Sequence, residues 1–87
     1  MNTLYKKSLG CVLTRIDDSF VILQGSEIYR LNEVGARIYD LCDGNNSKKD
    51  IVEKLAKFYD GDRMEIVRDV DEFIKELWDL QVIEVKK

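Results

Sequence analysis

Short apolar runs separated by turn-forming residues occupy the first third of the chain. The runs at residues 11–16, 20–24 and 27–31 are rich in β-branched and aliphatic residues, a pattern typical of strands. Asp17-Asp18-Ser19 and Gly25-Ser26 stand between them, and such Asp, Gly and Ser segments form tight turns. The pattern predicts three strands joined as an antiparallel meander, which needs a second layer over one of its faces.

Three later segments carry apolar residues at helical spacing and predict helices over residues 33–42, 48–59 and 62–80. Polar residues that cap helices stand at the start of each segment: Asn32, Ser47 with Asp50, and Asp62. We expect Asp43-Gly44 to end the first helix, with Gly44 in a left-handed conformation. The second half of the chain is therefore predicted to be helical.

One more short strand is expected at residues 82–85, which have strand character. Three strands followed by three helices, with short connections and no linker, predict a single α+β domain over residues 1–87. Its architecture is a three-stranded antiparallel sheet followed by three helices. The last two helices, joined by the tight Asp60-Gly61 turn, give this plan a winged helix-turn-helix outline.

Composition removes most of the side-chain chemistry that catalysis and metal binding use. The 87 residues include no histidine, and Cys11 and Cys42 are too far apart for CxxC or zinc-ribbon spacing. We therefore expect no catalytic residue, no metal and no cofactor, and a protein that is not an enzyme. No apolar stretch reaches the length of a signal peptide or a membrane span. We expect a cytoplasmic protein without a membrane partner, its two thiols reduced and buried.

Charge argues against the DNA-binding role that a winged-helix outline suggests. The net charge is −3, and the segment from Asp62 to Asp79, which would be the recognition helix, holds three basic and seven acidic residues. Carboxylates in the major groove are repelled by phosphates on both sides. A winged-helix DNA-binding regulator is the alternative from another class, and we expect no nucleic-acid partner.

The strand at residues 27–31 is expected at an edge of the meander, where its backbone groups lack a partner. It contains no proline and one basic residue, so an extended peptide can pair with it while the third helix forms a wall. That helix carries two apolar lines: the first is Ile66, Val70, Phe73 and Leu77, and the second is Val67, Ile74 and Trp78. Either one line faces the core and the other a groove, or both lines pack in the core. The same edge can pair two copies, so we expect a monomer or weak homodimer, with a plain dimerisation module as an alternative.

Three blocks, at Leu31–Gly44, Ile51–Asp60 and Asp69–Leu77, resemble in order and spacing the helical half of PqqD-like proteins. The resemblance covers about residues 8 to 85. It implies a winged-helix-like fold and membership among the recognition elements of pathways that make ribosomally synthesised, modified peptides. Such domains bind the leader segment of a precursor peptide as an added strand, against their third strand and third helix.

The resemblance implies a non-catalytic adaptor that presents the leader to a leader protease, a radical SAM enzyme or another modifying enzyme. Carried over by position, the peptide-binding residues are Glu27, Ile28, Tyr29, Arg30 and Leu31 of the strand and Val67, Asp71, Ile74, Lys75 and Trp78 of the helix. Lys75 is expected to pair with an acidic leader residue. Gln81 stands where many members have glycine after the third helix. The resemblance leaves two kinds of pathway open: chaperoning of the pyrroloquinoline quinone precursor, and lasso or other modified peptides.

Overall fold

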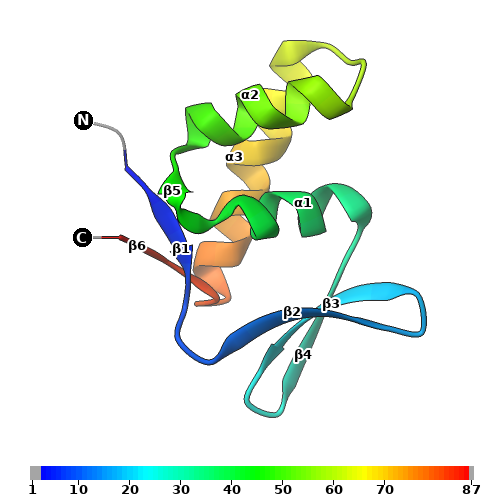
Figure 1. The fold of residues 1–87 in the computed structure, drawn as a ribbon, viewed down its shortest axis with the longest axis vertical. Helices are drawn as coiled ribbons and strands as arrows, with labels where there is room; N and C mark the ends of the chain where they lie inside the picture. Colours follow the sequence, from blue (N-terminus) through cyan, green and yellow to red (C-terminus); the bar gives the residue numbers. More distant parts are fainter. Residues whose placement is uncertain (1–2, 87) are drawn as a thin grey trace.

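The computed structural model describes residues 3–86 and contains two small sheets and three helices (Figure 1). The elements follow in the order β1 (Tyr5–Lys7), β2 (Cys11–Ile16), β3 (Ser19–Gln24), β4 (Glu27–Leu31), α1 (Glu33–Leu41), β5 (Asp43–Asn46), α2 (Lys48–Phe58), α3 (Arg63–Asp79) and β6 (Ile83–Val85). The helices pack together above the β2-β3-β4 sheet, whose far end extends away from them (Figure 1). This arrangement confirms the predicted α+β class and the three helices.

The predicted meander is present as an antiparallel sheet in the order β2-β3-β4. Both hairpins close with two-residue turns whose backbone suits the twist of paired strands. In the first turn Asp17 and Asp18 have φ angles of 51° and 67°, and in the second Gly25 has a φ of 58°. These two turns set the register of the strand pairs β2–β3 and β3–β4. Because β3 lies between the other two strands, β4 is at an edge of the sheet.

A second sheet, in the order β5-β1-β6, was only partly foreseen. The closing strand was predicted, but β1 and β5 were not, and β5 occupies Asp43–Asn46, where the sequence predicts only the end of the first helix. Tyr5–Lys7 is short and charged, and Asp-Gly-Asn-Asn is a turn-forming sequence with low strand propensity. Pairing with β1, which the chain order conceals, makes Asp43–Asn46 a strand, although Gly44 keeps the expected left-handed φ of 87°.

The core lies between the helices and the inner faces of both sheets. Residues of α3 that contribute to it recur every three or four positions: Ile66, Val70, Ile74 and Leu77. Phe73 is only half-buried, and half of the Trp78 side chain (50%) is exposed. The prediction that one apolar line of α3 packs in the core therefore holds in part, with Ile74 taking the place expected for Phe73. Within residues 3–86, none of the helices combines the length and the apolar character that crossing a membrane requires.

Helix α3 ends in a Schellman motif that places a non-glycine residue in the left-handed region. The backbone N–H of Val82 donates to the carbonyl of Leu77 at 3.2 Å, and that of Gln81 to the carbonyl of Trp78 at 3.0 Å. Gln81 has a φ of 61°, a conformation that glycine adopts without the steric cost of a Cβ. Gln81 therefore carries backbone strain that glycine at this position would relieve.

Replacing Gln81 with glycine is expected to stabilise the domain by about 1 kcal/mol, because relief of the left-handed strain exceeds the added entropy of the unfolded chain. In a domain of this size that corresponds to a rise in Tm of roughly 4–8 °C. The hydrogen bond from Gln24 Nε2 to the carbonyl of Gln81 (3.1 Å) is retained. Thermal unfolding measures the change, with Gln81→Ala as the control that keeps the strain; equal Tm values for the two variants would contradict it.

Candidate functional site

The exposed edge of β4 is the first component of the candidate site. Among residues 3–86, β4 pairs only with β3, and Gln24 opposite Glu27 closes their two-residue hairpin. A closing pair of this kind exchanges hydrogen bonds, and hydrogen-bonded pairs then alternate along the ladder. Tyr29 and Leu31 therefore bond to β3, whereas Ile28 and Arg30 direct their N–H and C=O groups away from the sheet. These outward groups are available to an added strand.

A cleft of about 420 Å³ lies between this edge and α3. Its lining residues are Ile28, Tyr29, Arg30 and Leu31 of β4, Phe73, Glu76 and Leu77 of α3, and Leu80 just beyond it. A second cavity of about 210 Å³ shares Phe73 and Glu76 with the first and adds Asn32, Val34, Ile38, Asp69 and Glu72. We call the two together the β4–α3 groove. It places a wall of apolar and acidic side chains beside an open strand edge.

The Phe73 ring forms part of both cavities and is held in place by a close approach of α1. A Cβ on residue 35 would overlap Cζ of Phe73, so only glycine leaves room for the ring where it stands. The backbone of Gly35 is itself fixed, because its N–H donates to Oδ1 of Asn32, the N-cap of α1, at 2.7 Å. A side chain at position 35 would push the ring out of its place in the groove.

The structure places the strand half and the helix half of the predicted site on different surfaces. The strand residues Glu27–Leu31 do lie along the open edge, but Asp71, Ile74, Lys75 and Trp78 surround a different cavity of about 510 Å³. That cavity also includes Thr3, Tyr5, Lys48 and Val85, and Asp71 forms an ion pair with Lys48 at 3.4 Å. Val67 is half-buried against the core. The second apolar line of α3 thus faces the β1 side of the molecule, not β4.

The residues that line the groove from α3 and just beyond it recur at helical spacing but with mixed polarity: Asp69, Phe73, Glu76 and Leu80, flanked by Glu72 and Leu77. An apolar stripe is what periodicity detects, so a face that alternates acidic and apolar side chains escaped the sequence analysis. The rotation of α3 is set by the packing of its core line, and only that rotation brings these side chains to β4. The sequence did hold one indication of this face, because its residues lie next to the core-facing residues of α3 along one side of the helix.

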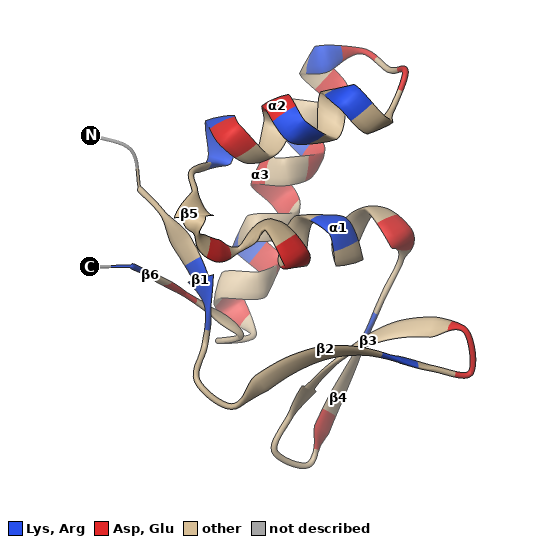
Figure 2. Ribbon diagram, in the orientation of Figure 1, with Lys and Arg blue, Asp and Glu red and all other residues tan. Residues whose placement is uncertain are grey.

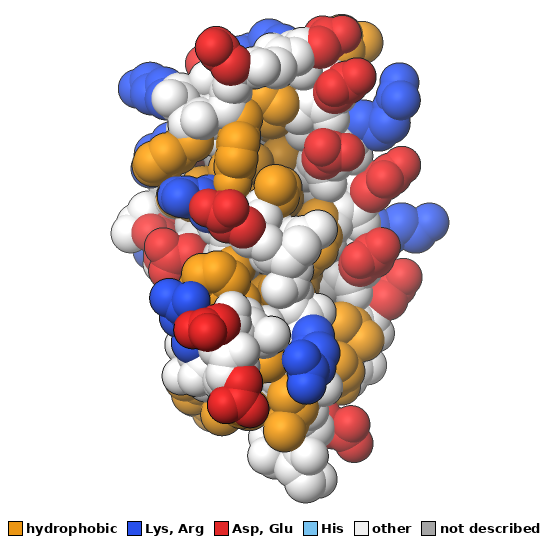
Figure 3. Space-filling model, turned by 90° about the vertical axis from the view of Figure 1, so that its right-hand side faces the viewer, with side chains coloured by type: hydrophobic (Ala, Val, Ile, Leu, Met, Phe, Trp, Pro, Cys, Tyr) orange, Lys and Arg blue, Asp and Glu red, His pale blue; other side chains and the backbone are white. Residues whose placement is uncertain are grey.

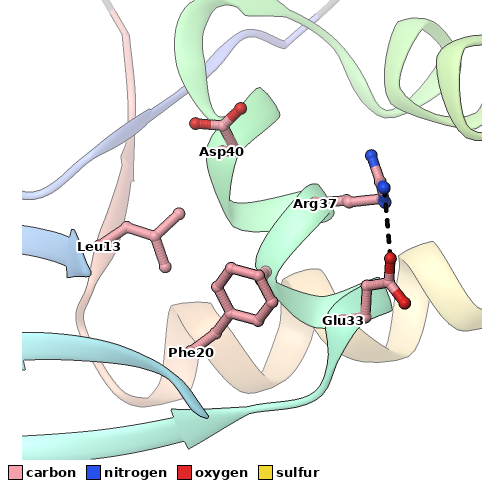
Figure 4. Close-up of a pocket in the computed structure, with 6 residues that line it drawn as sticks. Leu13, Phe20, Glu33, Arg37 and Asp40 are labelled. Atoms are coloured by element: carbon pink, nitrogen blue, oxygen red, sulfur yellow. Dashed lines mark hydrogen bonds and ion pairs between the residues drawn. The ribbon is translucent and has the colours of Figure 1, made fainter. Parts of the chain in front are cut away.

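A third cavity of about 310 Å³ lies between the hairpin sheet and α1 (Figure 4). Leu13 and Phe20 come from the sheet, and Glu33, Arg37 and Asp40 project from α1 (Figure 4). Arg37 is already engaged, because Nη2 lies 3.2 Å from Oε1 of Glu33 and the guanidinium lies 4.5 Å from the centre of the Phe58 ring. The cationic group of this cavity is thus committed to internal contacts.

Two side chains of the core that can lose a proton, the Cys42 thiol and the Tyr39 hydroxyl, stay in their neutral forms. Burial raises the pKa of the Cys42 thiol to about 12, and its side chain has no exposed surface. Burial also raises the pKa of Tyr39, whose hydroxyl donates to the carbonyl of Val82 at 3.2 Å. Cys11 is half-buried rather than buried as expected, and both cysteines are free. Among residues 3–86, no three Cys, Asp or Glu side chains gather in a way that could hold a metal ion.

Comparison with known proteins finds relatives both in sequence and in structure. Two proteins named PqqA binding protein match in sequence: one from Methylococcus capsulatus, 41% identical over 46 residues, and one from Rhodopseudomonas palustris, 37% identical over 60 residues. The matches cover 53% and 69% of this chain, and they span 50% and 59% of those relatives.

A solved structure, that of TbiB1 in complex with the TbiA(beta) leader peptide, has the same fold. It is 30% identical, with a TM-score of 0.78 over 91% of this chain and 94% of that one. Residues 12–83 match the family described as Coenzyme PQQ synthesis protein D (PqqD), which is most of the chain. The chain therefore belongs to the PqqD family.

Proposed function

We propose that this protein is a non-catalytic adaptor that binds the leader segment of a ribosomally synthesised precursor peptide and presents it to a leader protease or modifying enzyme. The observation that carries the proposal is the open edge of β4 beside the wall of α3. TbiB1, which shares this fold, was solved with a leader peptide, and the two sequence relatives are named for binding PqqA. The leader peptide bound to TbiB1 supports a peptide as the occupant of the groove.

The leader adds to the sheet as a fourth strand next to β4. Its backbone pairs with the outward N–H and C=O groups of Ile28 and Arg30, each bond contributing about 1 kcal/mol net. Every second side chain of the leader faces α3, because side chains alternate along a strand. Those side chains meet Phe73 and Leu80, which act as the apolar anchors. The groove is short, so the interface is at or below the ~1,600 Å² of a standard complex.

The proposal that the adaptor is non-catalytic rests on how few of its side chains could act as a nucleophile or as a general acid or base. The sequence has no histidine, and the buried Cys42 and Tyr39 are held in their neutral, unreactive forms. In this proposal the adaptor acts in the cytoplasm, where thiols stay reduced. Acidic residues along α3 (Figure 2) disfavour the alternative of a DNA-binding regulator, since phosphates repel them.

A second candidate is the more specific role of chaperoning the pyrroloquinoline quinone precursor together with a radical SAM enzyme. The names of the two sequence relatives favour it, whereas TbiB1 favours a leader peptide of another pathway. Titration with a PqqA peptide and with the leader of the precursor encoded beside this gene separates the two. Tighter binding of PqqA supports the chaperone role.

Amide NMR spectra recorded during the same leader titration test the adaptor proposal. We expect shifts concentrated in residues 27–32 and 69–80, and slower hydrogen exchange at the N–H groups of Ile28 and Arg30. A bound leader that shifts only the residues around Trp78 would contradict the proposal. So would the absence of binding when the modifying enzyme is also present.

A further inference from the structure

The β4–α3 groove carries charge as well as apolar surface, and the charge has one sign on the α3 wall. Asp69, Glu72 and Glu76 line it, and none of the ion pairs formed among residues 3–86 involves them. By contrast, Asp71 on the other side of α3 is paired with Lys48. In Figure 3, acidic side chains form a column along the right-hand edge of the view, with exposed hydrophobic side chains beside them.

The groove is graded along its length. The start of β4, at Ile28, shares the first cavity with Leu77 and Leu80, and Asn32 just after β4 shares the second with Asp69 and Glu72. The cavity beside β4 thus has one carboxylate, Glu76, among apolar residues, and the cavity past the end of β4 has three, Asp69, Glu72 and Glu76. The strand and the helix lie antiparallel across the groove, so the gradient follows the path of an added strand.

Spacing along the two elements is compatible with repeated contacts. Glu72 and Glu76 are one turn apart, about 6 Å along the helix axis, because each helical residue rises about 1.5 Å. Groove-facing side chains of a strand recur every two residues, about 6.7 Å. Two alternate side chains of an added strand can therefore each reach one of these carboxylates.

Arg30, the basic residue of β4, does not neutralise this wall. Its Nη1 lies 3.4 Å from Oγ of Ser19, across the sheet on β3. Lys75 of α3 lies in the cavity on the other side of the helix. The carboxylates of the groove are therefore left for the occupant to match, and charge complementarity indicates a cationic one.

We propose that the leader recognised by this protein carries an apolar side chain at the Leu77–Leu80 end of the groove and lysine or arginine at the alternate positions that face Glu76 and Glu72. This rests on the proposed function, because it describes the occupant of the same groove. The open edge supplies affinity for any extended chain, and the graded wall selects the sequence and fixes its register. Carboxylates alone would not define a site; here they line a cleft that also has an open strand edge.

The test is a selection from a displayed library of random 12-residue peptides against the whole chain. We expect the selected peptides to hold lysine or arginine at positions two apart, with an apolar residue on the same face. For the best synthetic peptide, Glu72→Gln/Glu76→Gln is expected to weaken binding about tenfold at low salt and less at high salt. The matched control, Asp60→Asn/Glu65→Gln, removes the same charge outside the groove and is expected to change binding less than twofold.

Two further variants separate failure of this inference from failure of the proposed function. If the selected peptides lose binding with Arg30→Pro or Phe73→Ala but carry no excess of basic residues and tolerate Glu72→Gln/Glu76→Gln, the charge inference is wrong and the groove still binds peptides. If the peptides are insensitive to Arg30→Pro and Phe73→Ala, or if none is selected, both are overturned. Replacing the basic residues of the peptide with glutamine should remove the effect of the Glu variants.

Discussion

Replacing Arg30 with proline is expected to lower the affinity for a leader peptide by about 10- to 100-fold while the domain stays folded. The N–H of residue 30 points away from β3, so proline removes a donor that only an added strand would use. Edge strands tolerate proline for the same reason. Leaving a carbonyl of the bound leader without its partner costs about 1–3 kcal/mol, which is the expected loss of affinity. Isothermal titration calorimetry measures it, and circular dichroism verifies the fold.

The opposite edge of the same sheet offers a matched control. Asp17-Asp18 closes the β2–β3 hairpin at Ile16 and Ser19, so Arg15 also directs its N–H outward, but on β2. The same alternation turns the N–H of Cys11 outward, and this group indeed donates to the carbonyl of Ser8. Arg15→Pro should leave binding unchanged. Arg30→Ala separates the loss of the side chain from the loss of the N–H. A folded Arg30→Pro variant with unchanged affinity would contradict the proposal that the leader pairs with β4.

Replacing Phe73 with alanine is expected to weaken leader binding by about 30-fold, or roughly 2 kcal/mol, as for a buried aromatic anchor. The ring lines both halves of the β4–α3 groove. Trp78→Ala is the matched control, because it removes a larger half-exposed aromatic ring from the other face of the same helix. We expect that variant to change affinity less than twofold in the same calorimetric titration.

Phe73 also packs against Gly35, so its removal lowers stability, and binding must be compared at a temperature where both variants are fully folded. Phe73→Leu, which keeps apolar volume, should recover part of the affinity. If Trp78→Ala weakens binding and Phe73→Ala does not, the leader lies on the β1 side of α3. The two aromatic residues thus decide which face of one helix carries the function.

Local sequence signals were enough for the elements that are joined by tight turns. The Asp-Asp and Gly-Ser turns, together with the apolar runs on each side, placed the hairpin strands to within a residue. The capping box at Ser47 and Asp50 formed as predicted, with both of its hydrogen bonds. Such signals act over three or four residues, so they survive without knowledge of the rest of the fold.

Elements whose stability comes from distant partners could not be found in this way. β5 has the composition of a turn and becomes a strand because β1, almost forty residues earlier, lies beside it. The rotation of α3 raised the same difficulty. Phe73 and Ile74 are adjacent apolar residues, and periodicity alone could not decide which of them enters the core.

By itself the sequence determined the α+β class, the three-stranded meander with residues 27–31 at its edge, and the absence of histidine chemistry, because turns, caps and composition are local properties. Only the tertiary structure decided which face of α3 lies beside β4. That choice depends on how Ile66, Val70, Ile74 and Leu77 pack against α1 and α2, and on the space that Gly35 leaves for Phe73. Packing is a property of several elements at once, so the groove and its acidic wall appear only when those elements are assembled.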